Sequence, residues 1–419
     1  MEQTIQTKQI KKQITKFGFY GFFKDLRFFD PVLLIFLYSF GLSAFQIGLL
    51  YSIREIIIYI FEIPSGVFAD LYGKKTELMI CFIFYIMSFL MFAFGSTFWM
   101  FAIAMILFGL GEAFRSGTHK AMIMQYLDIN HLSNEKSKTY GKTRSFSMIG
   151  SMVSSIFTIY LVIAIPDLKF LFIFAVIPYV IDLILIASYP KVLNDRKNIK
   201  FKWKQFAIEN KNSVTYAFKD SRIRNLLMIS STYSAVFKIL KDFIQLILIS
   251  IPLAYLYFSQ YGADDQVKIY SAIMYAFIFL ISAFSTRYAY LLLKFANHRK
   301  LIALTWVLTG LSALLIGIFS QEIIIVFIGF ILIYIFLNVR KPLIVELFGD
   351  YADKDKRASV LSIDSQLTSI LIVIFAPLIG LLSDHTSYGF MFIVVGISMV
   401  IIYLMSFIFN KNTNTKAVV

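Results

Sequence analysis

Long apolar runs are the feature that most constrains the fold of this chain. Segments such as 323–337 and 390–409 are almost continuously apolar, and similar runs recur along the 419 residues. A bilayer core of roughly 30 Å requires about 20 residues of helix, whereas a transmembrane β-barrel shows segments of about ten residues with alternating polarity. The runs therefore predict an all-α membrane protein, and a charged fraction of only 16% agrees with that class.

Twelve such spans can be placed, and a basic stretch separates them into two sets of six. The predicted organisation is an N-terminal half at 1–190, a cytoplasmic central loop at 191–222 and a C-terminal half at 223–419. Within that loop, 201–218 has the amphipathic pattern typical of a helix on the membrane surface. The predicted spans are 24–41, 46–68, 77–96, 98–127, 141–164, 168–188, 223–257, 266–293, 300–319, 321–347, 357–381 and 389–410.

The net charge of +15 falls mainly on one side of this arrangement. If both termini are cytoplasmic, the basic clusters at 74–75, 136–144 and 294–300 lie inside with the central loop, and the outer connections hold only Lys169 and Lys268. This distribution follows the positive-inside rule. Because the cations then hold the topology and meet anionic lipid, we predict no nucleic-acid partner. We expect an integral, monomeric protein of a bacterial cytoplasmic membrane.

The sequence contains no motif for disulfide formation, metal binding, ATP use or catalysis. Cys81 is the single cysteine, so neither an internal disulfide nor a Cys/His metal cluster is predicted. No phosphate-cradling loop suggests direct use of ATP, and no nucleophile–base set suggests an enzyme. We therefore expect no cofactor and no catalytic residue. The polar first sixteen residues hold no cleavage pattern, so the first span is expected to be retained.

The two halves carry the trace of an internal repeat. Three residues at the cytoplasmic end of the fourth span return at the end of the tenth with an offset of 225 positions. Parallel repeats of this kind predict two pseudo-symmetric six-helix halves. The matched residues are Arg115, Tyr126 and Asp128 in the first half and Arg340, Tyr351 and Asp353 in the second.

A short loop between the second and third spans carries the most specific motif. Gly66 is expected to let a neighbouring helix approach closely, and Gly73 to permit a tight reversal. Lys74 and Lys75 hold the loop inside. The spacing resembles the signature loop of the major facilitator superfamily, although Leu71 stands where many members have a basic residue. The loop reads Gly66-Val67-Phe68-Ala69-Asp70-Leu71-Tyr72-Gly73-Lys74-Lys75.

The resemblance implies the twelve-helix fold of that superfamily and a secondary transporter. In the family this loop latches the two halves in the outward-facing state. By resemblance Asp70 would be the latch, with Arg357 as its candidate partner. The alternative is a turn that fixes topology without switching. Many proton-driven drug exporters have a Gly- and Pro-rich pattern in their fifth helix. Residues 148–155 lack this pattern, so the sequence does not favour a drug exporter of that kind.

Charges inside the spans give the candidate substrate and coupling residues, because each costs roughly 2.5–3.5 kcal/mol at bilayer depth. The span 46–68 carries Arg54, Glu55 and Glu62. The two glutamates are seven apart and share a helix face, whereas Arg54 is turned about 100° from Glu55. Either carboxylate could take up and release a proton, or be permanently paired with Arg54 or Arg115.

The span 223–257 supplies the best candidate substrate surface. Lys238, Lys241 and Asp242 are spaced i, i+3 and i+4, so they lie on one face. The lysines favour a substrate with some negative charge. The alternative is a Lys241–Asp242 pair with no ligand role.

Other charges complete the candidate set. Glu112 and Arg115 are three apart and can pair with each other. His119 either relays protons or lies at the inner interface. Asp182 and Asp364 sit within apolar spans and are candidate cavity residues.

Together these features predict a secondary active transporter of a small solute that works by alternating access. Protons are the expected co-ion because carboxylates lie inside the spans, and export by antiport is favoured. Uptake of a small polar or anionic metabolite is the alternative. A lipid flippase on the same scaffold is the alternative from another class.

Overall fold

The structure of the chain is a computed structural model. It describes all residues except 1, 133–134, 166, 195–202, 253–257, 259, 289–291, 293, 354–355 and 415–419. Within the described residues the chain forms fifteen α-helices joined by short turns, with no strand. The predicted all-α class is therefore confirmed.

The helices divide between two compact units, each described here by itself. The first unit comprises 1–42, 49–203 and 271–279. Its main elements are α1 (Glu2–Lys24), η1 (Asp30–Val32), α2 (Leu33–Ser39), most of α3 (Ala44–Tyr72), α4 (Lys74–Phe94), α5 (Phe98–Arg115), α6 (Thr118–Ile129), α7 (Lys136–Ala164), α8 (Lys169–Ala187) and η3 (Lys191–Leu193).

The second unit comprises 43–48, 204–270 and 280–419. Its main elements are α9 (Trp203–Lys219), α10 (Ser221–Ile249), α11 (Ala263–Tyr288, of which 271–279 belong to the first unit), α12 (His298–Ile318), α13 (Ile323–Tyr351), α14 (Arg357–His385) and α15 (Tyr388–Asn414). The predicted amphipathic segment 201–218 contains α9, although 201–202 lie outside the described residues.

Two of the predicted spans contain a break in the helix, although Phe98–Ile129, which includes the predicted span 98–127, remains one candidate membrane span. At the predicted span 24–41, helix α1 ends at Lys24, and the chain becomes helical again at Asp30. The fourth is divided at Ser116–Gly117, where Gly117 adopts φ 74° and begins α6. Charged or polar residues flank both breaks, with Lys24, Asp25 and Arg27 at the first and Arg115, Ser116 and Thr118 at the second.

Many of the helices are suited to a membrane. Nine helical segments in the described part of the chain are long and apolar enough to cross one, and Asp30–Ser39 and Tyr388–Leu404 are shorter apolar helices. The prediction of an integral membrane protein is confirmed at this level, while the count of twelve spans and the symmetry of the halves stay predictions.

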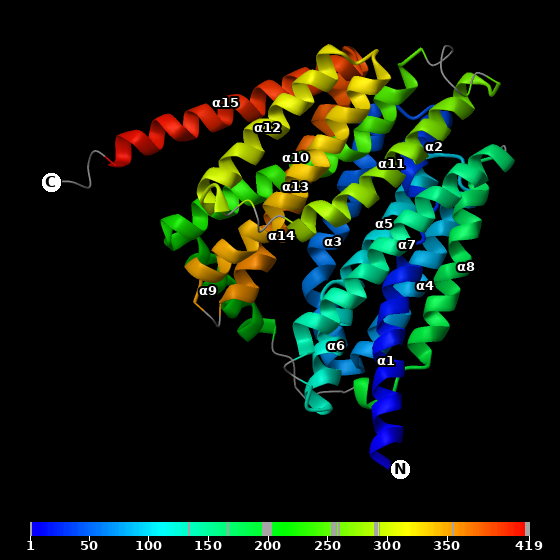
Figure 1. The fold of residues 1–419 in the computed structure, drawn as a ribbon, viewed down its shortest axis with the longest axis vertical. Coiled ribbons are helices and arrows are strands. Elements are labelled where there is room, and N and C mark those ends of the chain that lie inside the picture. Colours follow the sequence, from blue (N-terminus) through cyan, green and yellow to red (C-terminus); the bar gives the residue numbers. More distant parts are fainter. Residues whose placement is uncertain are drawn as a thin grey trace. The chain divides into compact units, whose positions relative to one another are not determined.

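Aromatic rings build the interior of the first unit, in which α1, α7 and α8 run alongside one another (Figure 1). Phe172 on α8 stacks on Phe29 at 4.7 Å and on Phe92 of α4 at 5.0 Å between ring centroids. Offset ring pairs of this kind contribute about 0.5–1.5 kcal/mol beyond their buried area. They fix α4 and α8 against the segment that follows the break in the first span.

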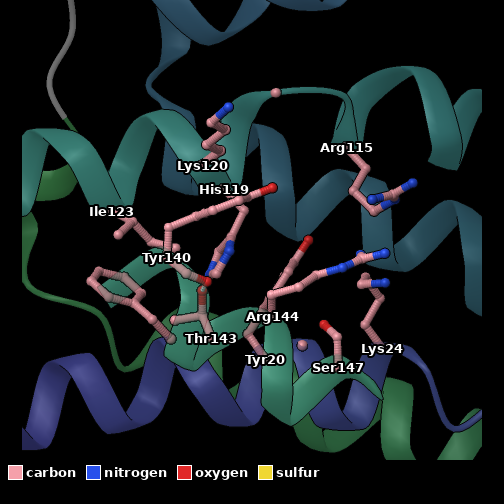
Figure 2. A pocket seen from close by; sticks show the side chains of 13 residues that line it. Tyr20, Lys24, Arg115, His119, Lys120, Ile123, Tyr140, Thr143, Arg144 and Ser147 are labelled. Carbon is pink, nitrogen blue, oxygen red and sulfur yellow. Dashed lines mark hydrogen bonds between the residues drawn. The ribbon is translucent and has the colours of Figure 1, made fainter. Parts of the chain in front are cut away.

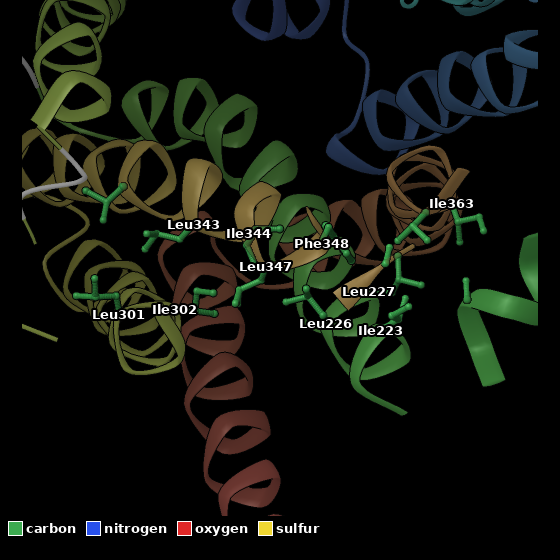
Figure 3. Packing of buried hydrophobic residues seen from close by; sticks show 14 residues of the cluster. Ile223, Leu226, Leu227, Leu301, Ile302, Leu343, Ile344, Leu347, Phe348 and Ile363 are labelled. Carbon is green, nitrogen blue, oxygen red and sulfur yellow. The ribbon is translucent and has the colours of Figure 1, made fainter. Parts of the chain in front are cut away.

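The second unit has an aliphatic core instead. Leu226 and Leu227 of α10 pack with Leu343 and Leu347 of α13 (Figure 3). Residues of α9, α12 and α14 complete the cluster. This core therefore ties α9, which lies in the predicted central loop, to the helices of the second unit.

Two glycines bring α1 and α7 into backbone contact. A Cβ added at Gly150 of α7 would collide with the carbonyl oxygen of Phe22, and one at Gly21 of α1 would collide with Ser147. By contrast, a Cβ at Gly141 on the same helix α7 would meet nothing within 4 Å. Small residues at such a seam permit close helix approach.

Gly150→Ala is expected to destabilise the protein by about 1–3 kcal/mol, because the added methyl group must push two backbones apart. Gly141→Ala is the matched control. It should be neutral or stabilise by up to about 1 kcal/mol, since alanine favours helix more than glycine does. Unfolding titrations of both variants in mixed micelles measure the difference, and equal stability of the two would contradict the close contact.

Candidate functional site

The break after α1 exposes backbone groups that side chains then satisfy. The carbonyl of Lys24 accepts a hydrogen bond from Tyr179 Oη at 2.8 Å. The amides of Asp25 and Leu26 bond back to the last turn of α1. Breaks in apolar segments persist where freed groups are satisfied in this way. The break places Arg27 against α5 and α8.

Two arginines share one carboxylate beside this break. Arg27 donates to Glu112 Oε1 at 2.8 Å and to Tyr179 Oη at 2.7 Å. Arg115 pairs with Glu112 Oε2, as the i, i+3 spacing allows, and its Nε donates to Tyr85 Oη at 3.1 Å. The side chain of Glu112 is 18% exposed. Since two positive charges face one negative charge, the trio keeps one net positive charge.

Asp182 on α8 is the least satisfied carboxylate near the break. It is fully buried, and neither of its oxygens has a hydrogen-bond partner among the described residues. Lys24 and Asp25 are the charged groups that act on it. Burying a polar group without a partner is costly, and more so when the group is charged. A carboxyl group in this position is therefore easier to accommodate with its proton on.

A pocket of about 220 Å³ opens between α1, α6 and α7. We call it the α1–α6–α7 pocket. Figure 2 shows basic side chains reaching into it from all three helices. Among the described residues its lining contains no carboxylate. The lining residues are Phe17, Tyr20, Gly21, Lys24, Arg115, Gly117, His119, Lys120, Ile123, Tyr140, Thr143, Arg144 and Ser147.

Aromatic contacts hold His119 at this pocket. Its ring stacks on Tyr20 with 3.5 Å between centroids, and its Nε2 lies 3.3 Å from Tyr189 Oη. The ring therefore packs against aromatic side chains, and its position relative to the inner interface stays a prediction. A relay role for His119 stays a prediction.

The candidate charges of α3 lie in separate pairs. Arg54 donates to Glu55 Oε1 at 2.9 Å, and Glu55 is 2% exposed. Glu62 instead accepts a hydrogen bond from Ser116 Oγ at 3.3 Å. The paired interpretation of Glu55 is thus the one that the geometry favours, with Arg54 as its partner.

In the second unit, the predicted charges again meet polar partners. Lys241 Nζ lies 2.6 Å from Asp242, so the pair expected from the spacing is present. Asp364 accepts a hydrogen bond from Ser230 Oγ at 3.0 Å, and the charge of Lys238 acts on it. The charge of Arg340 acts on Asp364 as well.

The two arginines of the repeat have different surroundings. Arg115 meets a carboxylate, whereas Arg340 donates to the carbonyl oxygen of Ile302 at 2.6 Å and lies over the Tyr233 ring at 4.3 Å. Equivalent positions in the sequence thus hold different chemistry.

The signature loop is a tight reversal, as predicted. Gly73 has φ 95° and stands between α3 and α4, where any side chain would also collide with Asn194. Lys74 bonds Gln125 at 2.7 Å, and Lys75 bonds the carbonyl of Ala187 at 2.6 Å.

Two further expectations for the loop concern the helix approach at Gly66 and the latch between Asp70 and Arg357. The close helix approach at Gly66 is not found, since a Cβ there would meet no described atom within 4 Å. Asp70 and Arg357 belong to different units, so the latch between them stays a prediction. Arg357 Nε donates to the carbonyl of Ala352 at 3.3 Å.

Two charged residues of this unit, Arg27 and Glu77, were missing from the predicted set. Arg27 lay near the start of the predicted span 24–41, where a basic residue is commonly interfacial. Glu77 lay at the start of the predicted span 77–96, but it is fully buried and accepts a hydrogen bond from Thr118 at 2.7 Å. The Asp30-Pro31 pair was a usable signal for the break beside Arg27.

The fold and the loop define a membrane protein of the transporter type, and comparison with known proteins places it in a family. The family model of the Major Facilitator Superfamily matches residues 19–297 and 243–418. The chain therefore belongs to the Major Facilitator Superfamily, which confirms the resemblance. That family consists of transporters rather than enzymes.

Individual relatives agree with this membership. The chain is 32% identical over 126 residues to the uncharacterized MFS-type transporter YxaM of Bacillus subtilis (strain 168), a match that spans 30% of this chain and 32% of the relative. The match thus covers about a third of that protein's length.

Solved structures share the whole fold. A variant of the nucleoside transporter NupG superposes with a TM-score of 0.80 at 13% identity, covering 94% of this chain and 98% of the other. A POT family transporter in complex with 5-aminolevulinic acid gives 0.77 at 12% identity, covering 96% of each chain. At these identities the likeness concerns the fold alone.

Proposed function

We propose that this protein is a proton-coupled secondary active transporter that moves a small solute by alternating access, with export by antiport as its direction. The observation that carries the proposal is Asp182, whose buried carboxyl group has no hydrogen-bond partner in the described part of the chain. A group that is costly to leave charged and costly to leave unpaired is suited to accept and release a proton during a cycle.

Two other carboxylates inside the helices, those of Glu55 and Glu112, support this assignment by contrast. Glu55 is paired with Arg54, and Glu112 lies between two arginines. A carboxylate held by a cation is stabilised in its charged form. Asp182 is therefore the better proton carrier, and Glu55 and Glu112 take structural roles.

Uptake of a small polar or anionic metabolite is the second candidate, and the distribution of cations supports an anionic solute. Lys238 and Lys241 lie in the second unit with Asp242, and Arg27 and Arg115 share one carboxylate in the first. An excess of positive charge inside a transporter attracts anionic solutes.

Purified protein reconstituted in liposomes is expected to move solute in response to an imposed pH gradient. An acidic exterior should drive export from inside-loaded vesicles if the protein is an antiporter, and uptake if it is a symporter. The panel should include nucleosides, short peptides and anionic metabolites, because the structural neighbours include a nucleoside transporter and peptide transporters. Transport that is equally fast with and without the gradient would contradict proton coupling.

A further inference from the structure

We propose that the α1–α6–α7 pocket binds a phosphate group, and that Arg144 is its principal charged ligand. The proposal goes beyond solute transport and does not depend on it, since it concerns occupancy of a pocket within the first unit.

Charge is the first argument. Lys24, Arg115, Lys120 and Arg144 all line the pocket. Lys24 pairs with Asp25 and Arg115 with Glu112. In the part of the chain that the structure describes, neither Lys120 nor Arg144 has a carboxylate partner. The pocket therefore carries uncompensated positive charge.

The direction of the side chains is the second argument. Figure 2 shows the head groups of Lys24, Arg115 and Arg144 reaching toward one side of the pocket. Lys24 and Arg115 have carboxylate partners, so Arg144 places beside them a cation that has none among the described residues, and an anion there would offset its charge. An Arg side chain offers a planar fork of donors that matches phosphate geometry. The arrangement is thus built for an anion with several acceptor oxygens.

Two further donors face the same space. Tyr20 is 3% exposed, lines the pocket, and its hydroxyl has no hydrogen-bond partner among the described residues. The first turn of α6 also borders the pocket at Gly117, His119 and Lys120, and no side chain caps it. Free amides at a helix start attract anions. The unpaired Tyr20 hydroxyl is an independent sign that a ligand oxygen belongs here.

Size sets the class of ligand. A volume of about 220 Å³ is smaller than the roughly 300–1,000 Å³ typical of sites for drug-sized molecules. It suits a single phosphate group with some water. That group could belong to a free phosphate-bearing solute or to the headgroup of an anionic lipid, and the chemistry of recognition is the same for both.

Titration of the full-length protein with inorganic phosphate in an uncharged detergent tests the site. Phosphate should bind and raise the unfolding temperature more than chloride does at equal ionic strength. Arg144→Gln should weaken binding about tenfold or more, because a charge-assisted hydrogen bond is lost. Arg144 is exposed, and its side chain has no hydrogen bond or ion pair among the described residues. Tyr20→Phe should also weaken binding, since it removes only the unpaired hydroxyl.

Lys142→Gln is the matched control, because Lys142 is an exposed cation of the same helix that does not line the pocket. It should bind phosphate like the wild type. Native mass spectrometry with phosphatidic acid and with phosphatidylcholine then separates the two sources. Retention of phosphatidic acid that is lost in Arg144→Gln, without any effect of inorganic phosphate, assigns the site to a lipid headgroup. If neither ligand distinguishes Arg144→Gln from Lys142→Gln, the proposal is wrong.

Discussion

Asp182→Asn is expected to abolish solute transport driven by a proton gradient, while solute exchange at equal pH continues. Asparagine has nearly the shape of aspartate but cannot take up a proton. If Asp182 carries the proton, the variant can still bind solute and change conformation. The proton gradient, however, no longer drives net transport of the solute. Exchange across vesicles at one pH and uptake under an imposed gradient measure the two properties separately.

Two controls make this experiment specific. Asp167→Asn removes an exposed carboxylate just before the same helix, α8, and should leave gradient-driven transport unchanged. Glu55→Gln removes the carboxylate that is paired with Arg54. If Glu55→Gln abolishes the effect of the gradient and Asp182→Asn does not, coupling lies on α3 and the assignment to Asp182 is wrong.

Glu112→Gln is expected to destabilise the protein by about 3–5 kcal/mol. Removing one partner of a buried ion pair leaves the other charge without compensation. Here the loss is shared by two guanidinium groups, those of Arg27 and Arg115, whose side chains are 16% and 30% exposed. Glutamine keeps one acceptor oxygen but no charge, so the two arginines would repel each other beside the break in the first span.

Denaturant unfolding in mixed micelles measures this change. Glu135→Gln is the matched control, since Glu135 is an exposed glutamate just before α7 whose side chain makes no cap. Arg27→Met provides a second comparison. It leaves the Glu112–Arg115 pair intact and should cost less than Glu112→Gln. A loss below about 1 kcal/mol for Glu112→Gln would show that the trio does not stabilise the fold.

The class of fold could be predicted from the sequence, but the positions of the helix breaks could not. Apolar runs identify spans because the bilayer requires a minimum helix length. They do not reveal where a helix stops inside such a run, since the stop after Lys24 depends on Tyr179, which lies 155 positions away. At the second break Gly117 has a left-handed backbone, and the polar residues Ser116 and Thr118 stand on either side of it.

The candidate site was predictable only where its partners are close in the chain. The spacing of Glu112 and Arg115 indicated their pairing, and that of Lys241 and Asp242 did the same. The third member of the first group, Arg27, is 85 positions from Glu112, and no local pattern connects them. Spacing on one helix likewise suggested a common role for Glu55 and Glu62, which in the structure have different partners.

The glycine seam between α1 and α7 has a practical consequence for studies of motion. Where one helix backbone rests on another with no room for a methyl group, the two helices cannot slide past each other without first separating. They should travel as a single rigid body. The distance between two spectroscopic labels, one on the exposed face of each helix, would then stay constant. That constant distance is a reference with which the displacement of any other helix can be compared.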